Sequence, residues 1–365
     1  MVAKVVLRTK TFSGLRSVDP TRDMRQVAAL MEEAFAGNLT RQGREALREL
    51  KIMGRFGPFL WLLDRTSPEF RETFRGFVWV EEGRVVGNIN VGRIGLYSLR
   101  WLISNVAVRS DYQGRGIAQH LVQAAIDLAR EHGGKWAVLQ VHTDNVPARR
   151  LYQHLGFEQI TAVTELRLEK VRPTALTEGD VFSRSQATSR GGSHAAETRA
   201  WEPALLHDCD VLASRRRSYS EWRKEFELAL AAASKNAQWL SPVRAHQFMV
   251  GLDQRLSRWL SGLFTGRREH RLAVEEGGRF IAALTVQASR RRGEHSLELM
   301  VHPDHRGQLE EMLITKALSI LGGYPERSVT VSHPIEHQEA IEALKLRGFV
   351  EKRTLAQMRL ALRGD

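Results

Sequence analysis

The chain has 365 residues, of which 42% are hydrophobic, enough to bury the cores of about two domains. Its formal net charge is +12, which would suit a polyanionic ligand, but charge alone fixes neither a fold nor a reaction. One cysteine, Cys209, excludes an intrachain disulfide, and no apolar run is long enough for a signal peptide or a membrane span. These features predict a cytoplasmic protein with no membrane partner.

The first elements in chain order are a short strand near residues 15–18, helices, and a hairpin over residues 76–91 with its turn at Glu82 and Gly83. Residues 36–75 lie before the hairpin and contain an apolar run from Arg55 to Leu63. Two interpretations of this run stay open. It forms a wall of a ligand pocket, or it is buried against a second domain.

An apolar strand at residues 106–108 runs into a glycine turn and then into a helix. Gly114 and Gly116 allow successive backbone N–H groups to converge, and a helix that starts near Ile117 adds the positive end of its dipole. Apolar residues at helical spacing predict that this helix continues to a stop at residues 132–134. The stretch therefore predicts a pyrophosphate cradle made of backbone rather than of charged side chains.

Two other phosphate-binding loops do not fit this stretch. A Walker-type loop needs Lys-Ser or Lys-Thr after its last glycine, where Ile117 and Ala118 stand. A dinucleotide-binding loop needs a third glycine where Gln119 stands. It also needs an acidic residue at the end of the next strand, and the strand expected at residues 136–142 has none.

A helix motif follows that strand. Asn145 is suited to cap a helix that Pro147 opens, and Gly156 is suited to end it before another strand. The full pattern is Asn145-x-x-Ala148-x-x-Leu151-Tyr152-x-x-x-Gly156-Phe157. Together with Gln113-x-x-Gly116-x-Ala118, it resembles the acetyl-CoA motifs of the GNAT superfamily of N-acetyltransferases, and the two motifs cover residues 106–157.

The resemblance implies an α/β fold in which a mixed, mostly antiparallel twisted sheet is flanked by helices. It also implies acetyl-CoA as the cosubstrate, no metal, and direct attack by a primary amine in a ternary complex without a covalent enzyme intermediate. The residues that it assigns to coenzyme binding are Val106, Ala107, Val108, Gln113, Gly114, Arg115, Gly116, Ile117, Ala118 and Asn145.

The same resemblance makes Tyr152 the candidate general acid for the coenzyme sulfur, although a tyrosine there can also serve only to pack the helix. Glutamates that many relatives carry are replaced here by Ser104, Asn105 and Gln140. His142 shares a strand face with Gln140 and is the candidate base, acting directly or through water. An ordinary strand-end histidine remains the alternative interpretation.

The chain repeats itself once. Three motifs, which begin at Val80, Val108 and Asn145, recur from Val274, Val301 and His337, with offsets of 194, 193 and 192 residues. Phe157, which ends the third motif, recurs as Phe349 with an offset of 192. A near-constant shift over half of the chain predicts two tandem domains rather than a solenoid. We expect a first domain at residues 1–170, a linker at 171–197, and a second domain at 198–365 that starts with a strand near residues 198–201.

The second copy is degenerate at the motif positions. Leu309 stands where the first copy has its second glycine. Glu310 and Glu311 then place negative charge on the first helical turn, which suits the helix dipole but would repel a pyrophosphate. Leu344 replaces the tyrosine and His337 replaces the asparagine. We expect this copy to be retained for its structure and not to catalyse the reaction.

The expected acceptor is a small-molecule or peptide amine. Arginines within residues 36–75 suggest an acceptor with a carboxylate or phosphate group: Arg41, Arg44, Arg48 and Arg55. A protein N-terminal or ribosomal-protein acetyltransferase is one alternative, favoured by Asn105-Val-Ala-Val and disfavoured by Gln140. A non-catalytic CoA-binding interaction module is another, and a homodimer is left open.

The densest basic runs are Arg215–Arg217 and Arg290–Arg292. Neither run is interleaved with the aromatic residues that a base-stacking surface needs. We interpret both runs as solvated surface and do not expect a nucleic acid partner.

Overall fold

The computed structural model describes residues 12–37, 47–48, 51, 75–95, 98–171, 214–249, 266–291 and 293–362. Contacts within the chain divide it into two compact units, which we call unit 1 (residues 1–160 and 355–365) and unit 2 (residues 161–354). Across the described ranges, no helix combines the length and apolar character that a membrane span needs. The same ranges contain no group of three or more His, Cys, Asp or Glu side chains placed to bind a metal ion.

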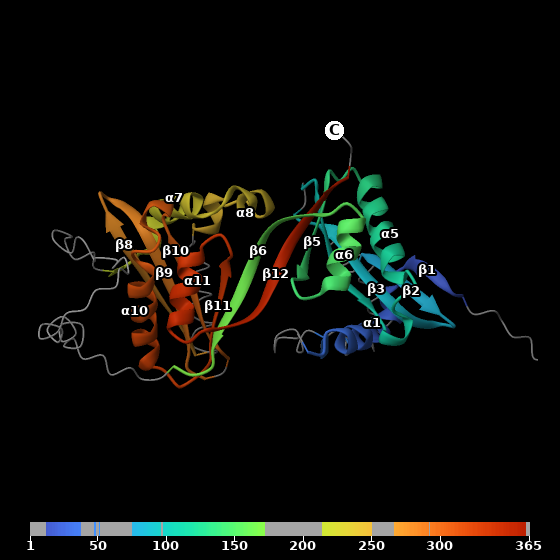
Figure 1. Ribbon diagram of the computed structural model, residues 1–365, viewed down its shortest axis with the longest axis horizontal. Coiled ribbons are helices and arrows are strands. Elements are labelled where there is room, and N and C mark those ends of the chain that lie inside the picture. The colour runs from blue at the N-terminus through green and yellow to red at the C-terminus, as the bar shows by residue number, and fades with distance from the viewer. Residues whose placement is uncertain are drawn as a thin grey trace, which may run out of the picture. The chain divides into compact units, whose positions relative to one another are not determined.

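Unit 1 is built on a sheet with the strand order β1-β2-β3-β4-β5-β12 (Figure 1). Neighbouring strands pair antiparallel, except that β4 and β5 pair parallel. Its elements are β1 (Gly14–Ser17), α1 (Pro20–Ala34), β2 (Gly76–Glu81), β3 (Arg84–Arg93), β4 (Arg100–Val108), the short helix η1 (Ser110–Tyr112), α5 (Ile117–Glu131), β5 (Trp136–His142), α6 (Val146–His154) and the second part of β12 (Val350–Ala361).

Helices α1 and α5 pack on opposite faces of this sheet. Val78 and Val80 of β2 join Leu30 of α1 in one apolar cluster. Phe77 and Trp79, which alternate with them along the strand, pack instead against the cluster that contains α5. This two-sided packing confirms the mixed, helix-flanked sheet, and the hairpin at residues 76–91, the helix from Ile117 and the strand at residues 136–142 are confirmed with it.

Unit 2 has a sheet with the order β6-β11-β10-β9-β8-β7, in which only β10 and β11 pair parallel. Its strands are β6 (Glu158–Leu168), β7 (Arg215–Arg216), β8 (Arg267–Glu276), β9 (Arg279–Ser289), β10 (His295–Val301) and β11 (Val329–Pro334), and its helices are η2 (Tyr219–Glu221), α7 (Trp222–Ala232), α8 (Lys235–Leu240), η3 (Ala245–Gln247), η4 (Pro303–His305), α10 (Glu310–Gly322) and α11 (Gln338–Leu346). The element order of unit 1 therefore recurs, which confirms the tandem fold expected from the repeat.

Each unit takes its last strand from the other half of the chain. Strand β12 pairs with β5 in the register Leu355 to His142 through Ala361 to Trp136. Strand β6 pairs with β11 from Val163 opposite Pro334 to Leu168 opposite Val329. The compact units therefore differ from the linear boundaries 1–170 and 198–365, because each copy's final strand satisfies the open edge of the other copy.

Two expectations, one about the linker and one about a basic run, need correction. Val171 falls in the expected linker, but its side chain is buried in the core of unit 2. Arg217 belongs to a basic run interpreted as solvated, yet it is buried, with its guanidinium 2.9 Å from the Glu225 carboxylate. The strand near residues 198–201, Cys209, residues 172–197 and the run from Arg55 to Leu63 lie outside the described residues.

Candidate active site

Strands β4 and β5 diverge in the middle of the sheet of unit 1. Their parallel pairing runs only from Arg100 opposite Trp136 to Ile103 opposite Leu139. Beyond that point, the rest of β4 pairs with β3, and the rest of β5 pairs with β12. The facing edges of β4 and β5 thus leave backbone groups for a ligand that enters between them.

A bulge in β4 lies where the two strands separate. The β3–β4 register shifts between Asn88 and Asn90, and Asn105 has a positive φ of 55°. The Asn88 side chain is buried and donates from Nδ2 to the Asn105 carbonyl oxygen at 3.1 Å. Asn88 therefore holds the bulge in place and aims the residues after it. Sequence reasoning missed this role, although a polar residue inside a strand of apolar neighbours was a usable signal.

The turn after β4 has the backbone that a pyrophosphate cradle needs. Gly114 and Gly116 have φ angles of 76° and 77°, a left-handed conformation that favours glycine. Helix α5 begins at Ile117 with no acidic residue in its first turn, so its N-terminal N–H groups keep their positive field. A Cβ atom added at Gly114 would meet no other atom within 4 Å, so the space in front of the loop is open. The residues present fit a bound diphosphate.

The charged and polar side chains of this turn brace the loop. Gln113 donates from Nε2 to the Val108 carbonyl oxygen at 3.1 Å. Arg115 donates to the Asp111 carbonyl oxygen at 2.9 Å and lies over the Tyr112 ring, 4.6 Å from its centroid. The cradle is therefore made of backbone, and its side chains fix the shape.

The remaining coenzyme-site candidates divide between the two faces of the sheet. Ala107 is buried in the cluster under α1, whereas Val106 and Val108 pack toward the α5 side. Ile117 is buried and anchors the first turn of α5, and Ala118 beside it is half-buried.

Helix α6 begins and ends as the motif predicts. The Asn145 side chain caps it by accepting the Ala148 N–H at 3.2 Å. Tyr152 of this helix is 6% exposed in the same apolar cluster as α5, with its ring 5.9 Å from that of Phe157. Burial raises the pKa of the Tyr152 phenol to about 12, so the hydroxyl stays protonated at neutral pH.

His142 lies at the end of β5 on the other face of the sheet. Leu139 and Val141 point into the cluster that contains Tyr152, so Gln140 and His142 point away from it. The His142 side chain is 21% exposed, and its Nδ1 lies 3.9 Å from an Asp144 carboxylate oxygen. The structure therefore places His142 and Tyr152 on opposite faces of the sheet, and His142 lies beyond the point where β4 and β5 separate.

Unit 2 fills the equivalent cradle with its own carboxylate. Leu309 occupies the position of the second glycine with an ordinary φ of −111°. The buried Glu310 carboxylate accepts the Leu309 N–H at 3.1 Å and contacts Nε2 of His337 at 2.7 Å. Burial raises the pKa of Glu310, but hydrogen bonds from His337 and from backbone N–H groups outweigh that effect and lower it. An internal anion thus takes the place that a ligand's anion would need.

A buried imidazole pair extends this arrangement. His337 Nδ1 lies 2.9 Å from Nε2 of His333, and both rings are 3% exposed. Burial, followed by the neighbouring His337, lowers the pKa of His333 to about 3, so His333 is neutral at pH 7. Leu344, at the position of Tyr152, is buried in the core of unit 2. Glu310 was expected to repel a pyrophosphate; in the structure its carboxylate itself occupies the loop.

Comparison with known proteins identifies the fold and an acetyltransferase region. The family described as "Acetyltransferase (GNAT) family" matches residues 44–157. A GCN5-related N-acetyltransferase from Sphaerobacter thermophilus has the same fold, with a TM-score of 0.56, 13% identity and 96% coverage of both chains. A tandem GNAT protein from the clavulanic acid biosynthesis pathway gives a TM-score of 0.51 at 17% identity, over 96% of this chain and 99% of that one.

Curated relatives agree with this assignment. The chain is 29% identical over 131 residues to N-alpha-acetyltransferase RimI of Mycobacterium tuberculosis, over 35% of this chain and 81% of that protein. It is 38% identical over 60 residues to N-alpha-acetyltransferase 30 of Schizosaccharomyces pombe, over 16% of this chain and 40% of that protein. The protein is thus an acyltransferase with a tandem GNAT fold. Residues 44–157 match the GNAT family of acetyltransferases, and the whole chain shares the fold of a tandem GNAT protein.

Proposed function

We propose that unit 1 transfers an acetyl group from acetyl-CoA to a primary amine, by direct attack in a ternary complex. The observation that carries the proposal is the open backbone cradle beside the divergence of β4 and β5. The equivalent cradle of unit 2 contains the Glu310 carboxylate, so we assign the reaction to unit 1 alone.

The backbone after the β4 bulge would position the thioester. N–H groups of Val106 to Val108 that face the gap can donate to the thioester carbonyl and to the pantetheine amides. Such donors stabilise the negative charge that develops on the carbonyl oxygen as the amine attacks. Holding both reactants in register removes the entropy cost of bringing them together, a term worth roughly 7–11 kcal/mol at best.

Two side chains, one on each face of the sheet, would interact with the reacting groups. His142 accepts the proton that the attacking amine must lose, on the face away from Tyr152. Tyr152 donates to the leaving thiolate on the opposite face. A phenol of pKa about 12 does not readily protonate a thiolate, whose acid has a pKa of roughly 8.5. We therefore assign Tyr152 the role of hydrogen-bond donor that stabilises the thiolate before solvent protonates it.

The acceptor class is a small-molecule or peptide amine in the cytoplasm, and a peptide N-terminus is the second candidate. The alignment with most of the length of RimI favours it. Gln140 stands against it, because its amide cannot serve as the carboxylate base that such enzymes often carry there. If acetyl-CoA binds and no amine reacts, the chain is a non-catalytic CoA-binding module instead.

The test follows release of free CoA with a panel of amines, peptides among them. We expect turnover with at least one acceptor and a fall in kcat of about 100-fold for Tyr152→Phe, within the usual range for loss of one hydrogen-bond donor to a developing negative charge. Tyr324→Phe is the matched control, because the Tyr324 hydroxyl is hydrogen-bonded to His270 in unit 2, away from the proposed site. This variant should leave kcat unchanged.

The same assay tests His142. We expect His142→Gln to lower kcat/KM, because glutamine cannot accept the proton of the attacking amine. Unchanged turnover in Tyr152→Phe would refute its role, and an unchanged kcat/KM in His142→Gln would refute the assignment of the base.

A further inference from the structure

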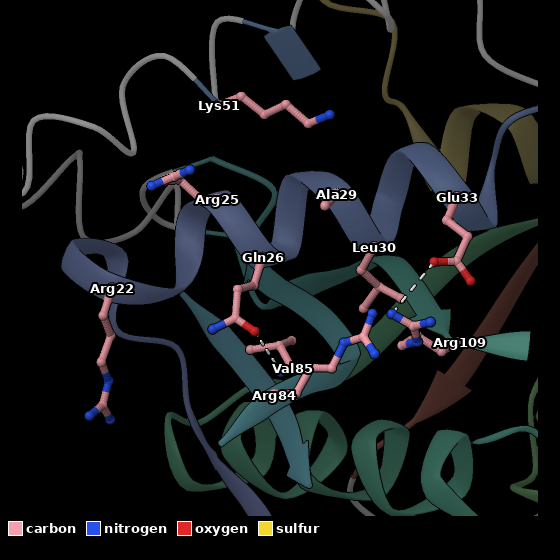
Figure 2. Close-up of a pocket in the computed structure, with 10 residues that line it drawn as sticks. All are labelled: Arg22, Arg25, Gln26, Ala29, Leu30, Glu33, Lys51, Arg84, Val85 and Arg109. Atoms are coloured by element: carbon pink, nitrogen blue, oxygen red, sulfur yellow. Dashed lines mark hydrogen bonds and ion pairs between the residues drawn. The ribbon is translucent and has the colours of Figure 1, made fainter. Parts of the chain in front are cut away.

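A cationic cavity of about 690 Å³ lies in unit 1 under helix α1, next to the start of β3 and the end of β4 (Figure 2). We call it the α1 cavity. Five cations and one carboxylate contribute to its lining: Arg22, Arg25, Lys51, Arg84, Arg109 and Glu33. Nothing in the proposed acetyl transfer uses this excess of positive charge.

Carboxylates pair with only part of that charge. Arg22 lies 3.1 Å from Asp19, Lys51 is paired with Glu32, and Arg109 lies 3.1 Å from Asp111 and 3.8 Å from Glu33. Within the described part of the chain, Arg25 and Arg84 form no salt bridge. Two guanidinium groups are thus available to an anion.

Arg84 and Arg109 converge on the same side of the cavity, as Figure 2 shows for their guanidinium groups beneath α1. A hydrogen bond from Arg109, and then the charges of Arg109 and Arg84, lower the pKa of the Asp111 carboxyl in the turn that leads into the cradle. The two guanidinium groups repel each other, and one exposed carboxylate does not neutralise both charges. Binding of a further anion near both groups is therefore favoured.

Unit 2 provides an internal control for this cavity. Its equivalent, of about 500 Å³, lies between α7, the start of β9 and the end of β10. Arg279 corresponds to Arg84, and His302 corresponds to Arg109. There the lining has two permanent cations, Lys224 and Arg279, against three carboxylates: Glu227, Glu276 and Asp304. The fold therefore does not require a cationic cavity, and of these two cavities the positively charged one lies beside the open cradle.

We propose that the α1 cavity binds a phosphate group. A phosphate monoester carries a charge of about −1.5 to −2 at pH 7, and its oxygens match the paired N–H groups of a guanidinium. Two sources supply this chemistry: the ribose 3′-phosphate of the coenzyme, or a separate phosphorylated ligand. Only the first source rests on the proposed function.

Two titrations of the full-length chain, followed calorimetrically, test the proposal. One titrates inorganic pyrophosphate into protein saturated with CoA. The other compares CoA with 3′-dephospho-CoA, which lacks only that phosphate. The variant is Arg25→Gln with Arg84→Gln, two exposed arginines, and the matched control is Arg279→Gln in unit 2.

If the cavity binds a separate phosphorylated ligand, pyrophosphate should bind the CoA-saturated protein, and the double variant should weaken pyrophosphate binding by about tenfold or more. If the cavity binds the 3′-phosphate of the coenzyme, CoA should bind more tightly than 3′-dephospho-CoA, and the double variant should remove this difference in affinity. Arg279→Gln should change neither result. The proposal is overturned if the double variant alters neither titration, or if Arg279→Gln alters them equally. If CoA itself does not bind, the proposed function fails, and pyrophosphate binding to the free protein still tests the cavity through the same variants.

Discussion

The two cradles of this chain solve one physical problem in two ways. A helix N-terminus leaves backbone N–H groups that need a partner. In unit 1, glycines at positions 114 and 116 leave the loop open for an external anion. In unit 2, Leu309 has replaced the second glycine, and Glu310 supplies the anion internally. The same backbone design can therefore be a ligand site or a structural contact, and two neighbouring side chains decide which.

Replacing the cradle residues of unit 1 by those of unit 2 should have the largest effect on coenzyme binding. Gly116→Leu with Ile117→Glu gives unit 1 the residues of unit 2 at these positions. We expect acetyl-CoA affinity to fall by about 1,000-fold, because a carboxylate would displace at least two charge-assisted hydrogen bonds to the diphosphate. Calorimetric titration measures this loss, and a cooperative thermal unfolding transition would show that the graft still folds. Retained affinity in a folded graft would contradict the equivalence of the two cradles.

A matched pair of glycines separates strain from binding. Gly114 and Gly307 occupy equivalent positions, with φ angles of 76° and 79°. Substitution by Ala should cost each site a similar amount of stability, about 1–2 kcal/mol. We expect only Gly114→Ala to weaken the binding of acetyl-CoA, by about tenfold, since its Cβ would project into the open space of the cradle. Equal losses of affinity in both variants would mean that the effect is global strain.

Acid should destabilise the buried imidazole pair of unit 2. His333 has a folded-state pKa of about 3, below its unfolded value, so the unfolded chain takes up the proton first. The lowered pKa of Glu310 acts in the same direction, and its contribution is lost as pH falls below the usual carboxyl range. We expect stability to fall by a few kcal/mol as the pH drops from about 6.5 toward 3.

The variant His333→Gln tests this acid sensitivity, because glutamine retains a hydrogen-bond donor and carries no titrating group. Melting temperatures measured from pH 7 to pH 4 should fall less steeply in His333→Gln than in the wild type. Equal slopes in the wild type and in His333→Gln would contradict the account.

Local patterns predicted much of this molecule from its sequence. The glycine turn, the helix from Ile117 and the Asn145 cap depend on residues close together in the chain, so short-range chemistry was enough to place them. The repeat also predicted two copies of one fold. The exchange of β6 and β12 was not predictable in this way, because both strands have the same alternating pattern and either could satisfy either open edge.

Long-range pairing also explains what the sequence missed at the site. Asn88 supports the β4 bulge through a contact with Asn105, 17 residues further along the chain. Glu310 was identified as a repulsive charge, but its partner His337 lies 27 residues away. Arg217 was counted as surface because its partner Glu225 belongs to a helix that packs over it. In each case the missing information was a contact between elements rather than a preference of a residue type.

The stoichiometry of coenzyme binding tests the central claim most directly. Titration of the full-length wild-type chain with CoA should give one site per chain, and Gly116→Leu with Ile117→Glu should remove that site. Two sites per chain would contradict the account, because the cradle of unit 2 would then bind coenzyme despite Glu310. A single site that survives the graft would contradict it as well, because the coenzyme would be bound elsewhere.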